Sequence, residues 1–151
     1  MPGASCTRTT LSPVTEVLLA TDADWIHREV SAALDGEHTI SWVRHGADVR
    51  EAVDERDPDL VVLDLQIGNM GGMATCIDLH LEAGAGRLPD VPVLMLLDRH
   101  ADVFLARRSN ADGWLIKPLD AFRLRRAVSA LLAGDTYVEG MPEPETAAEP
   151  A

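Results

Sequence analysis

The chain has 151 residues, of which 46% are hydrophobic and 25% charged, which suits one soluble domain with one buried core. The formal net charge of −12 argues against direct nucleic-acid binding, because a phosphate backbone is met by clustered Lys and Arg. Two cysteines are too few for a disulfide framework or a zinc site. No apolar run is long enough to span a membrane, and no signal-peptide core is present, so we expect a cytoplasmic protein.

Five short apolar runs predict β-strands, because continuous apolar runs of this length are typical of strands buried on both faces. In chain order they lie at residues 17–20, 40–43, 60–63, 91–97 and 114–116. Helices are predicted between and after them, where apolar residues recur at helical spacing. The helical stripes are Ile26, Val30, Ala33 and Leu34; Val49, Ala52 and Val53; Met73, Cys76, Ile77 and Leu81; a weaker segment at 101–109; and Leu124, Val128, Leu131 and Leu132.

This alternation predicts an α/β fold, with a doubly wound five-stranded parallel sheet and helices on both faces. The folded domain is predicted at residues 14–134. Residues 1–13, rich in Ser, Thr and Pro, are predicted to form a flexible leader. Residues 135–151 are predicted to form a disordered tail, acidic and rich in Pro and Ala. In such folds the functional crevice lies at the carboxyl ends of the strands.

Charged residues follow the predicted strands at these ends, and three of them suggest a shared site. Asp22 follows the first strand and Asp64 the third, so the two carboxylates converge if these strands are neighbours. Nearby carboxylates repel unless a cation separates them, and Mg²⁺ suits such a pair because it takes oxygen ligands. Lys117 is the only lysine and would supply a compact positive charge opposite, or else be a surface lysine. Asp64 is thus a candidate nucleophile for an aspartyl-phosphate.

Four segments, in order, resemble the receiver domain of bacterial response regulators. Residues 58–65, with Gly72 eight positions after Asp64, resemble the phosphoacceptor segment. Residues 92–95 and 111–118 resemble the fourth strand and the fifth strand with its lysine loop, and Asp22 with Arg28 resembles the first acidic segment. The resemblance covers roughly residues 15–133 and implies the flavodoxin-like strand order 2-1-3-4-5.

The resemblance also implies a role for each matching residue. Asp64 would accept the phosphoryl group, and Lys117 would pair with that group. Mg²⁺ would be bound by Asp22, Asp64 and the backbone carbonyl of Gln66. Trp114 stands where the family has a switch aromatic, although ordinary packing explains a tryptophan there equally well.

The sequence departs from the family pattern at three positions. Thr21 replaces an acidic residue, which predicts weaker Mg²⁺ binding. Leu97 replaces the Ser or Thr that hydrogen-bonds the phosphoryl group, and losing that bond removes about 1.5–3 kcal/mol from the difference between the two states. Gly68 replaces a proline. Asp98, next to Leu97, can point into the crevice or cap the following helix, and we favour the cap.

These features favour a stand-alone receiver domain in a two-component phosphorelay, with at most a weak autophosphatase activity. The alternative is a phosphorylation-independent interaction module. A third, less favoured hypothesis is a small phosphatase in which Asp22 is the nucleophile and Asp24 the acid/base, because residues 22–24 resemble the haloacid-dehalogenase motif.

The predicted partners are a histidine kinase or other phosphodonor protein and a downstream protein. We expect the partner surface, and any homodimer, at the face of the helix at 101–109, the strand at 114–116 and the last helix. Arginines on this face would meet acidic partners or remain solvated: Arg107, Arg108, Arg123 and Arg126.

Overall fold

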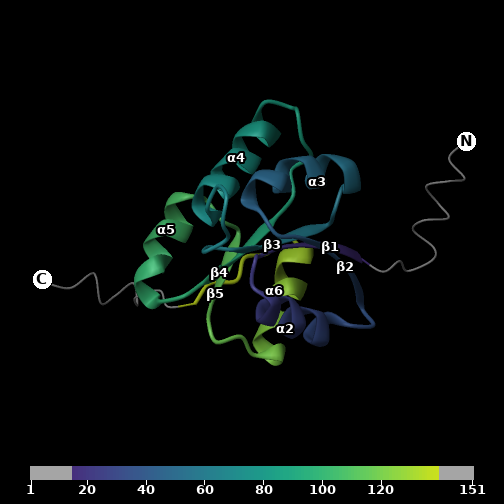
Figure 1. Cartoon of the computed structure of the whole chain (residues 1–151), viewed down its shortest axis with the longest axis vertical. Helices are drawn as coiled ribbons and strands as arrows, with labels where there is room; N and C mark the ends of the chain where they lie inside the picture. Colours follow the sequence, from purple (N-terminus) through teal and green to yellow (C-terminus); the bar gives the residue numbers. More distant parts are fainter. Residues whose placement is uncertain (1–14, 140–151) are drawn as a thin grey trace, which may run out of the picture.

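The computed structural model describes residues 15–139, which form a parallel sheet between two helical layers (Figure 1). The strand order is β2-β1-β3-β4-β5, with every neighbouring pair parallel, as predicted. The strands are β1 (Thr15–Ala20), β2 (His38–Val43), β3 (Leu60–Asp64), β4 (Val93–Leu97) and β5 (Gly113–Ile116). The helices are α2 (Asp24–Leu34), α3 (Val49–Arg56), α4 (Gly72–Gly84), α5 (Val103–Arg108) and α6 (Ala121–Leu132), with 3-10 turns η1 (Gly46–Asp48) and η2 (His100–Asp102).

The sheet separates two hydrophobic cores, because successive side chains of a strand point to opposite faces. Leu18 of β1 packs in the core beneath α3, α4 and α5, whereas Leu19 packs in the core covered by α2 and α6. The residues of β3 and β4 are all buried, as expected for central parallel strands. Between Thr15 and Glu139, no helix has the length and apolar character needed to cross a membrane.

The predicted helical stripes are confirmed for α2 and α3 and wrong in part for α4. All four predicted stripe residues of α2 are buried. In α4, however, Leu81 is 65% exposed, while Thr75 and Leu79 are buried beside Cys76. The hydroxyl of Thr75 donates a hydrogen bond to the carbonyl of Met70 at 3.0 Å. The burial of Thr75 therefore leaves no hydroxyl without a hydrogen-bond partner. A pattern built from apolar residues alone therefore includes the exposed Leu81 and omits the buried Thr75.

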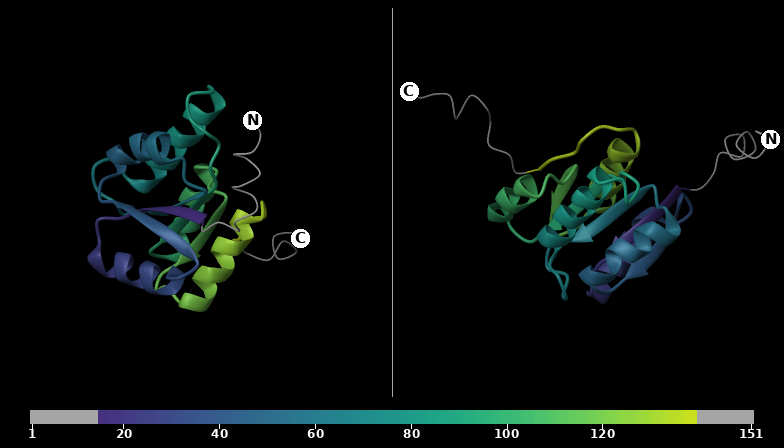
Figure 2. Two further views of the ribbon diagram at one scale, coloured as in Figure 1. Left: turned by 90° about the vertical axis from the view of Figure 1, so that its right-hand side faces the viewer. Right: turned by 90° about the horizontal axis from the view of Figure 1, so that it is seen from above.

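Ordered structure continues five residues past the predicted boundary at residue 134. The segment 135–139 turns back from α6 and lies along the free edge of β5 (Figures 1 and 2, yellow). The backbone N–H of Trp114 donates to the carbonyl of Tyr137 at 2.8 Å, in the manner of an added parallel strand. The predicted leader and residues 140–151 of the predicted tail lie outside the described residues.

Gly46 offers a test of the packing between η1 and the loop after β3. A Cβ atom at this position would lie 1.8 Å from the carbonyl oxygen of Met70. We expect Gly46→Ala to lower the free energy of unfolding by about 1–3 kcal/mol, measured by urea denaturation. Gly84→Ala is the control, because no heavy atom lies within 4 Å of its Cβ position and alanine favours helix. Equal midpoints for the two variants would contradict this packing.

Candidate functional site

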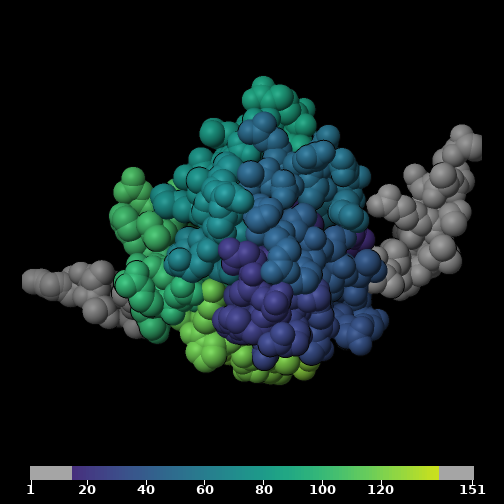
Figure 3. Space-filling model, in the orientation of Figure 1, coloured from purple at the N-terminus to yellow at the C-terminus, as the bar shows by residue number. Residues whose placement is uncertain are grey.

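The predicted acidic residues converge at the carboxyl edge of the sheet, because β1 and β3 are hydrogen-bonded neighbours. Asp64 is the last residue of β3 and is buried, whereas Asp22 follows β1 and is exposed. The backbone N–H of Gly68, in the loop after β3, donates to Asp22 Oδ2 at 3.0 Å. In the space-filling view, the start of α2 and the residues after β3 meet on one face (Figure 3). Asp22 is thus attached to the loop that follows Asp64.

Both carboxylate oxygens of Asp64 accept hydrogen bonds. Lys117 Nζ lies 2.8 Å from Oδ1, and the backbone N–H of Gln66 donates to the same oxygen at 3.1 Å. The hydroxyl of Thr21 donates to Oδ2 at 2.7 Å. Three donors satisfy the oxygens of a side chain that is 2% exposed, and they fix its orientation.

Thr21 has a role that sequence reasoning missed, since we treated it only as a lost acid. It is fully buried, and besides donating to Asp64 its Oγ1 accepts from the N–H of Ala23 at 3.1 Å. Gly68 is similarly informative. A proline there would lack the N–H that bonds Asp22, so this departure from the family pattern contributes a hydrogen bond. The sequence signal for the role of Thr21 was a hydroxyl residue directly before Asp22 at the end of a predicted strand.

Lys117 lies between two carboxylates at the end of β5. Its Nζ contacts Asp64 Oδ1 at 2.8 Å and Asp98 Oδ1 at 2.6 Å, and its side chain is 12% exposed. Burial lowers the pKa of Lys117, but the hydrogen bonds to the two aspartates outweigh it and raise the pKa above its ordinary value. The lysine is therefore a fixed cation near neutral pH. The Lys117–Pro118 peptide bond is cis, as the sequence suggested.

The prediction that Asp98 caps the next helix is wrong. The N-cap residue of η2 is Arg99, whose backbone N–H donates to Asp102 Oδ2 at 3.1 Å. Because Asp102 already supplies the carboxylate of this capping box, Asp98 is free to turn into the crevice toward Lys117.

The two predicted switch positions lie in the same core, between the sheet and α5. Leu97 is fully buried and Trp114 is 5% exposed. The indole N–H of Trp114 donates to the backbone carbonyl of Glu139 at 2.9 Å, which holds the ring inward. Leucine has no hydroxyl that could donate to a phosphoryl oxygen.

Arg123, predicted to face a partner, is paired within the chain. Its guanidinium contacts Glu139 through Nε–Oε2 and Nη2–Oε1, both at 2.7 Å, and Nη2 also donates to the carbonyl of Ile116 at 2.9 Å. Glu139 Oε1 in turn accepts from the N–H of Ile116 at 3.0 Å. The segment 135–139 thus satisfies the outer backbone groups of β5 and covers part of the expected partner face.

Asp24, the acid/base of the phosphatase hypothesis, is exposed and paired with Arg44, whose Nη1 lies 3.1 Å from Asp24 Oδ1. Arg44 also stacks on Trp42, 4.6 Å from the ring centroid. Asp24 therefore belongs to a cluster with Arg44 and Trp42 that is separate from the Asp64–Lys117 pair. This arrangement does not favour an Asp22–Asp24 catalytic pair.

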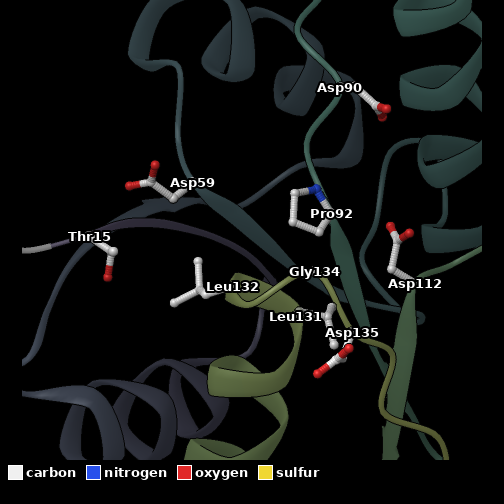
Figure 4. A pocket seen from close by; sticks show the side chains of 9 residues that line it. All are labelled: Thr15, Asp59, Asp90, Pro92, Asp112, Leu131, Leu132, Gly134 and Asp135. Carbon is white, nitrogen blue, oxygen red and sulfur yellow. The ribbon is translucent and has the colours of Figure 1, made fainter. Parts of the chain in front are cut away.

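A separate pocket opens at the opposite, amino-terminal edge of the sheet (Figure 4). Two of its four aspartates bond backbone N–H groups: Asp59 accepts from Glu16 at 2.8 Å and Asp112 from Val93 at 2.8 Å. These acids therefore anchor strand ends, and the crevice around Asp64 remains the candidate functional site.

Comparisons with known proteins identify a family for most of the chain. A family model described as the response regulator receiver domain matches residues 17–129. The regulatory protein LuxO of Vibrio cholerae serotype O1 is 37% identical over 93 residues, which are 60% of this chain and 19% of that protein. The nitrate/nitrite response regulator protein NarL of Escherichia coli K12 is 31% identical over 98 residues, or 65% of this chain and 44% of that protein. The chain spans less than half the length of these two relatives.

Solved structures share the fold. A LuxR-family two-component response regulator from Aurantimonas has a TM-score of 0.72 at 20% identity, covering 83% of this chain and 89% of that one. The chemotaxis response regulator CheY4 of Vibrio cholerae has a TM-score of 0.68 at 20% identity, covering 78% of this chain and 98% of that one. At this identity the likeness supports the fold alone.

Glu139 allows the attachment of the C-terminal segment to be tested. Burial raises the pKa of Glu139, but hydrogen bonds from Arg123 and from the Ile116 N–H outweigh it and lower the pKa. Glu139→Gln is expected to lower the free energy of unfolding by about 1 kcal/mol at neutral pH, a modest value because both side chains are partly exposed. A lowered folded-state pKa gives stability that is complete above the unfolded pKa and lost as pH falls through the folded pKa.

The measurement is urea denaturation of both proteins at several pH values, with the exposed residue Glu55 changed to Gln as the control. The difference in the free energy of unfolding between wild type and Glu139→Gln should become smaller at acidic pH. A difference that persists there would show that the ion pair is not its source.

Proposed function

We propose that this chain, which belongs to the response regulator receiver domain family, accepts a phosphoryl group on Asp64 and transmits the signal through protein–protein contacts. The observation that supports this most is the pairing of buried Asp64 with Lys117 at 2.8 Å at the carboxyl edge of the sheet. Receiver domains of two-component systems interact with histidine kinases and downstream partners, so a phosphohistidine donor is the expected source of the group.

The residues fit a Mg²⁺ ion held by few protein ligands. The carboxylates of Asp22 and Asp64 and the backbone carbonyl of Gln66 would bind it, with waters completing the shell. Gly68 supports this set by holding Asp22 beside the loop that contains Gln66. Among the side chains of residues 15–139, no group of three or more His, Cys, Asp and Glu forms a metal site. When bound, the ion would neutralise charge on the phosphoryl oxygens.

The chain's own contribution to the transfer is orientation and charge. Thr21 and Gln66 hold the Asp64 carboxylate in one rotamer through bonds of 2.7 and 3.1 Å. An Asp64 oxygen attacks the phosphorus, the bond from phosphorus to the donor atom breaks, and the donor leaves with the electron pair. Lys117, a cation at the same site, then pairs with the transferred group.

A second function, a phosphorylation-independent interaction module, has a specific observation in its favour. Leu97 is fully buried where the family has a hydroxyl, and the Trp114 indole is bonded to Glu139. A phosphoryl group shifts a conformational equilibrium only by its differential contacts with the two states. The absence of a donor at position 97 reduces that difference, so phosphorylation at Asp64 need not be accompanied by switching.

The proposed phosphorylation is tested with acetyl phosphate and Mg²⁺, followed by intact-mass measurement. We expect one phosphoryl group per chain, dependent on Mg²⁺ and abolished by Asp64→Asn. Asp54→Asn, an exposed position on α3, is the control and should behave as wild type. If neither wild type nor Asp64→Asn gains mass or changes its Trp fluorescence, the interaction module is the better description.

Thr21→Asp should increase the affinity for Mg²⁺ and lower the stability of the metal-free protein. A new carboxylate beside Asp64 repels it without metal, so the thermal midpoint should fall, while Mg²⁺ should bind about tenfold tighter, or about 1.4 kcal/mol. The midpoint and the Mg²⁺ titration of tryptophan fluorescence measure both effects. Thr21→Asn, similar in size but uncharged, is the control. Equal Mg²⁺ affinity in the two variants would refute the assignment of this pocket as the metal site.

A further inference from the structure

Lys117 contacts two carboxylates, those of Asp64 and Asp98. The proposed function requires only Asp64, yet Asp98 is the closer of the two. Lys117 Nζ lies 2.6 Å from Asp98 Oδ1 and 2.8 Å from Asp64 Oδ1. Asp98 directly follows β4, the strand between β3 and β5, so the sheet itself sets it between the ends that carry Asp64 and Lys117. The contact is therefore part of the architecture of the crevice.

Burial shows how the three side chains are layered. The side chain of Asp64 is 2% exposed, that of Lys117 12% and that of Asp98 36%. Asp64 thus lies deepest, and Asp98 approaches Lys117 from the solvent side. A phosphoryl group joined to an Asp64 oxygen has to extend toward solvent, because the protein interior closes the other side. It would reach Lys117 on the side where Asp98 already lies.

We propose that Asp98 competes with the phosphoryl group for Lys117 and thereby slows phosphoryl transfer to Asp64. This inference rests on the proposed function and adds a positioning residue, which acts through Lys117, to its site. The transfer forms a bond from phosphorus to Asp64 and breaks the bond to the donor. Asp98 makes and breaks no covalent bond. Its carboxylate must leave Lys117, and it repels the incoming anion at short range.

The distribution of acids in the crevice supports the same conclusion. The family pattern places an acid at position 21, where it would face the metal. This chain has Thr21 there, which donates to Asp64, and has an acid at position 98 instead. The crevice therefore keeps three aspartates and one lysine, but the third carboxylate neutralises the lysine and does not help to bind a cation. This arrangement gives Lys117, whose side chain is 12% exposed, two carboxylate partners in the metal-free protein.

The first test compares initial rates of phosphorylation by acetyl phosphate at fixed Mg²⁺ for wild type and Asp98→Ala. We expect the variant to react about tenfold faster, since one charge-assisted contact of Lys117 no longer has to break. Asp90→Ala is the matched control, because Asp90 is an exposed aspartate at the opposite edge of the sheet (Figure 4) and its removal changes net charge equally.

A wild-type rate for Asp98→Ala, while Asp64→Asn remains unreactive, would overturn the competition and leave the proposed function intact. An equal increase in Asp90→Ala would also overturn it, since net charge would then be the cause. Failure of both wild type and Asp98→Ala to accept a phosphoryl group would instead refute the proposed function, and the competition with it.

The second test observes Lys117 directly and requires no phosphorylation. Because Lys117 is the only lysine, protein labelled with ¹⁵N-lysine gives a single side-chain ammonium signal. Hydrogen bonds to two carboxylates protect its protons from water. Exchange with water should accelerate severalfold in Asp98→Ala and remain unchanged in Asp90→Ala. Unchanged exchange in Asp98→Ala would show that Asp98 does not hold the lysine.

Discussion

The ion pair between Asp64 and Lys117 is the contact on which the crevice depends. A parallel sheet brings the ends of β3 and β5 together across β4, and the 2.8 Å contact makes a lysine and an aspartate compatible with burial. The other polar contacts are arranged around this pair. Thr21 and Gln66 bond to the same carboxylate, Gly68 holds Asp22 beside it, and Asp98 completes the contacts of the lysine.

The face predicted to bind a partner is linked to the same strand. β5 carries Trp114 and leads into Lys117, and its outer edge is bonded to residues 137–139. Displacing this segment would expose backbone donors of an edge strand, which readily pair with another chain. Contacts made by a partner, or by a second copy, at α5, β5 and α6 would therefore meet the C-terminal segment and the Arg123–Glu139 pair first.

Much of the fold follows from local pattern, and the structure shows why the remainder does not. Buried parallel strands give continuous apolar runs, and their alternation with helical stripes permits few topologies. The buried face of α4 was predicted wrongly in part, because Thr75 is buried through a hydrogen bond to the carbonyl of Met70. The spacing of apolar residues cannot reveal such a bond. The domain was predicted to end at residue 134 because the sequence after it is acidic and rich in proline. Composition does not reveal that Glu139 pairs with Arg123, which lies on another element.

By itself, the sequence determined the α/β architecture, the strand order implied by the family pattern, and the presence of Asp22, Asp64 and Lys117 at strand ends, because these depend on periodicity and on position in a strand. The tertiary structure alone decided where side chains turn. Asp98 turns to Lys117 because Asp102 already caps η2, and Thr21 donates to Asp64 because β1 lies beside β3. The partners reached in this way, Lys117 for Asp98 and Asp64 for Thr21, lie at the ends of other strands and are brought near only by the fold.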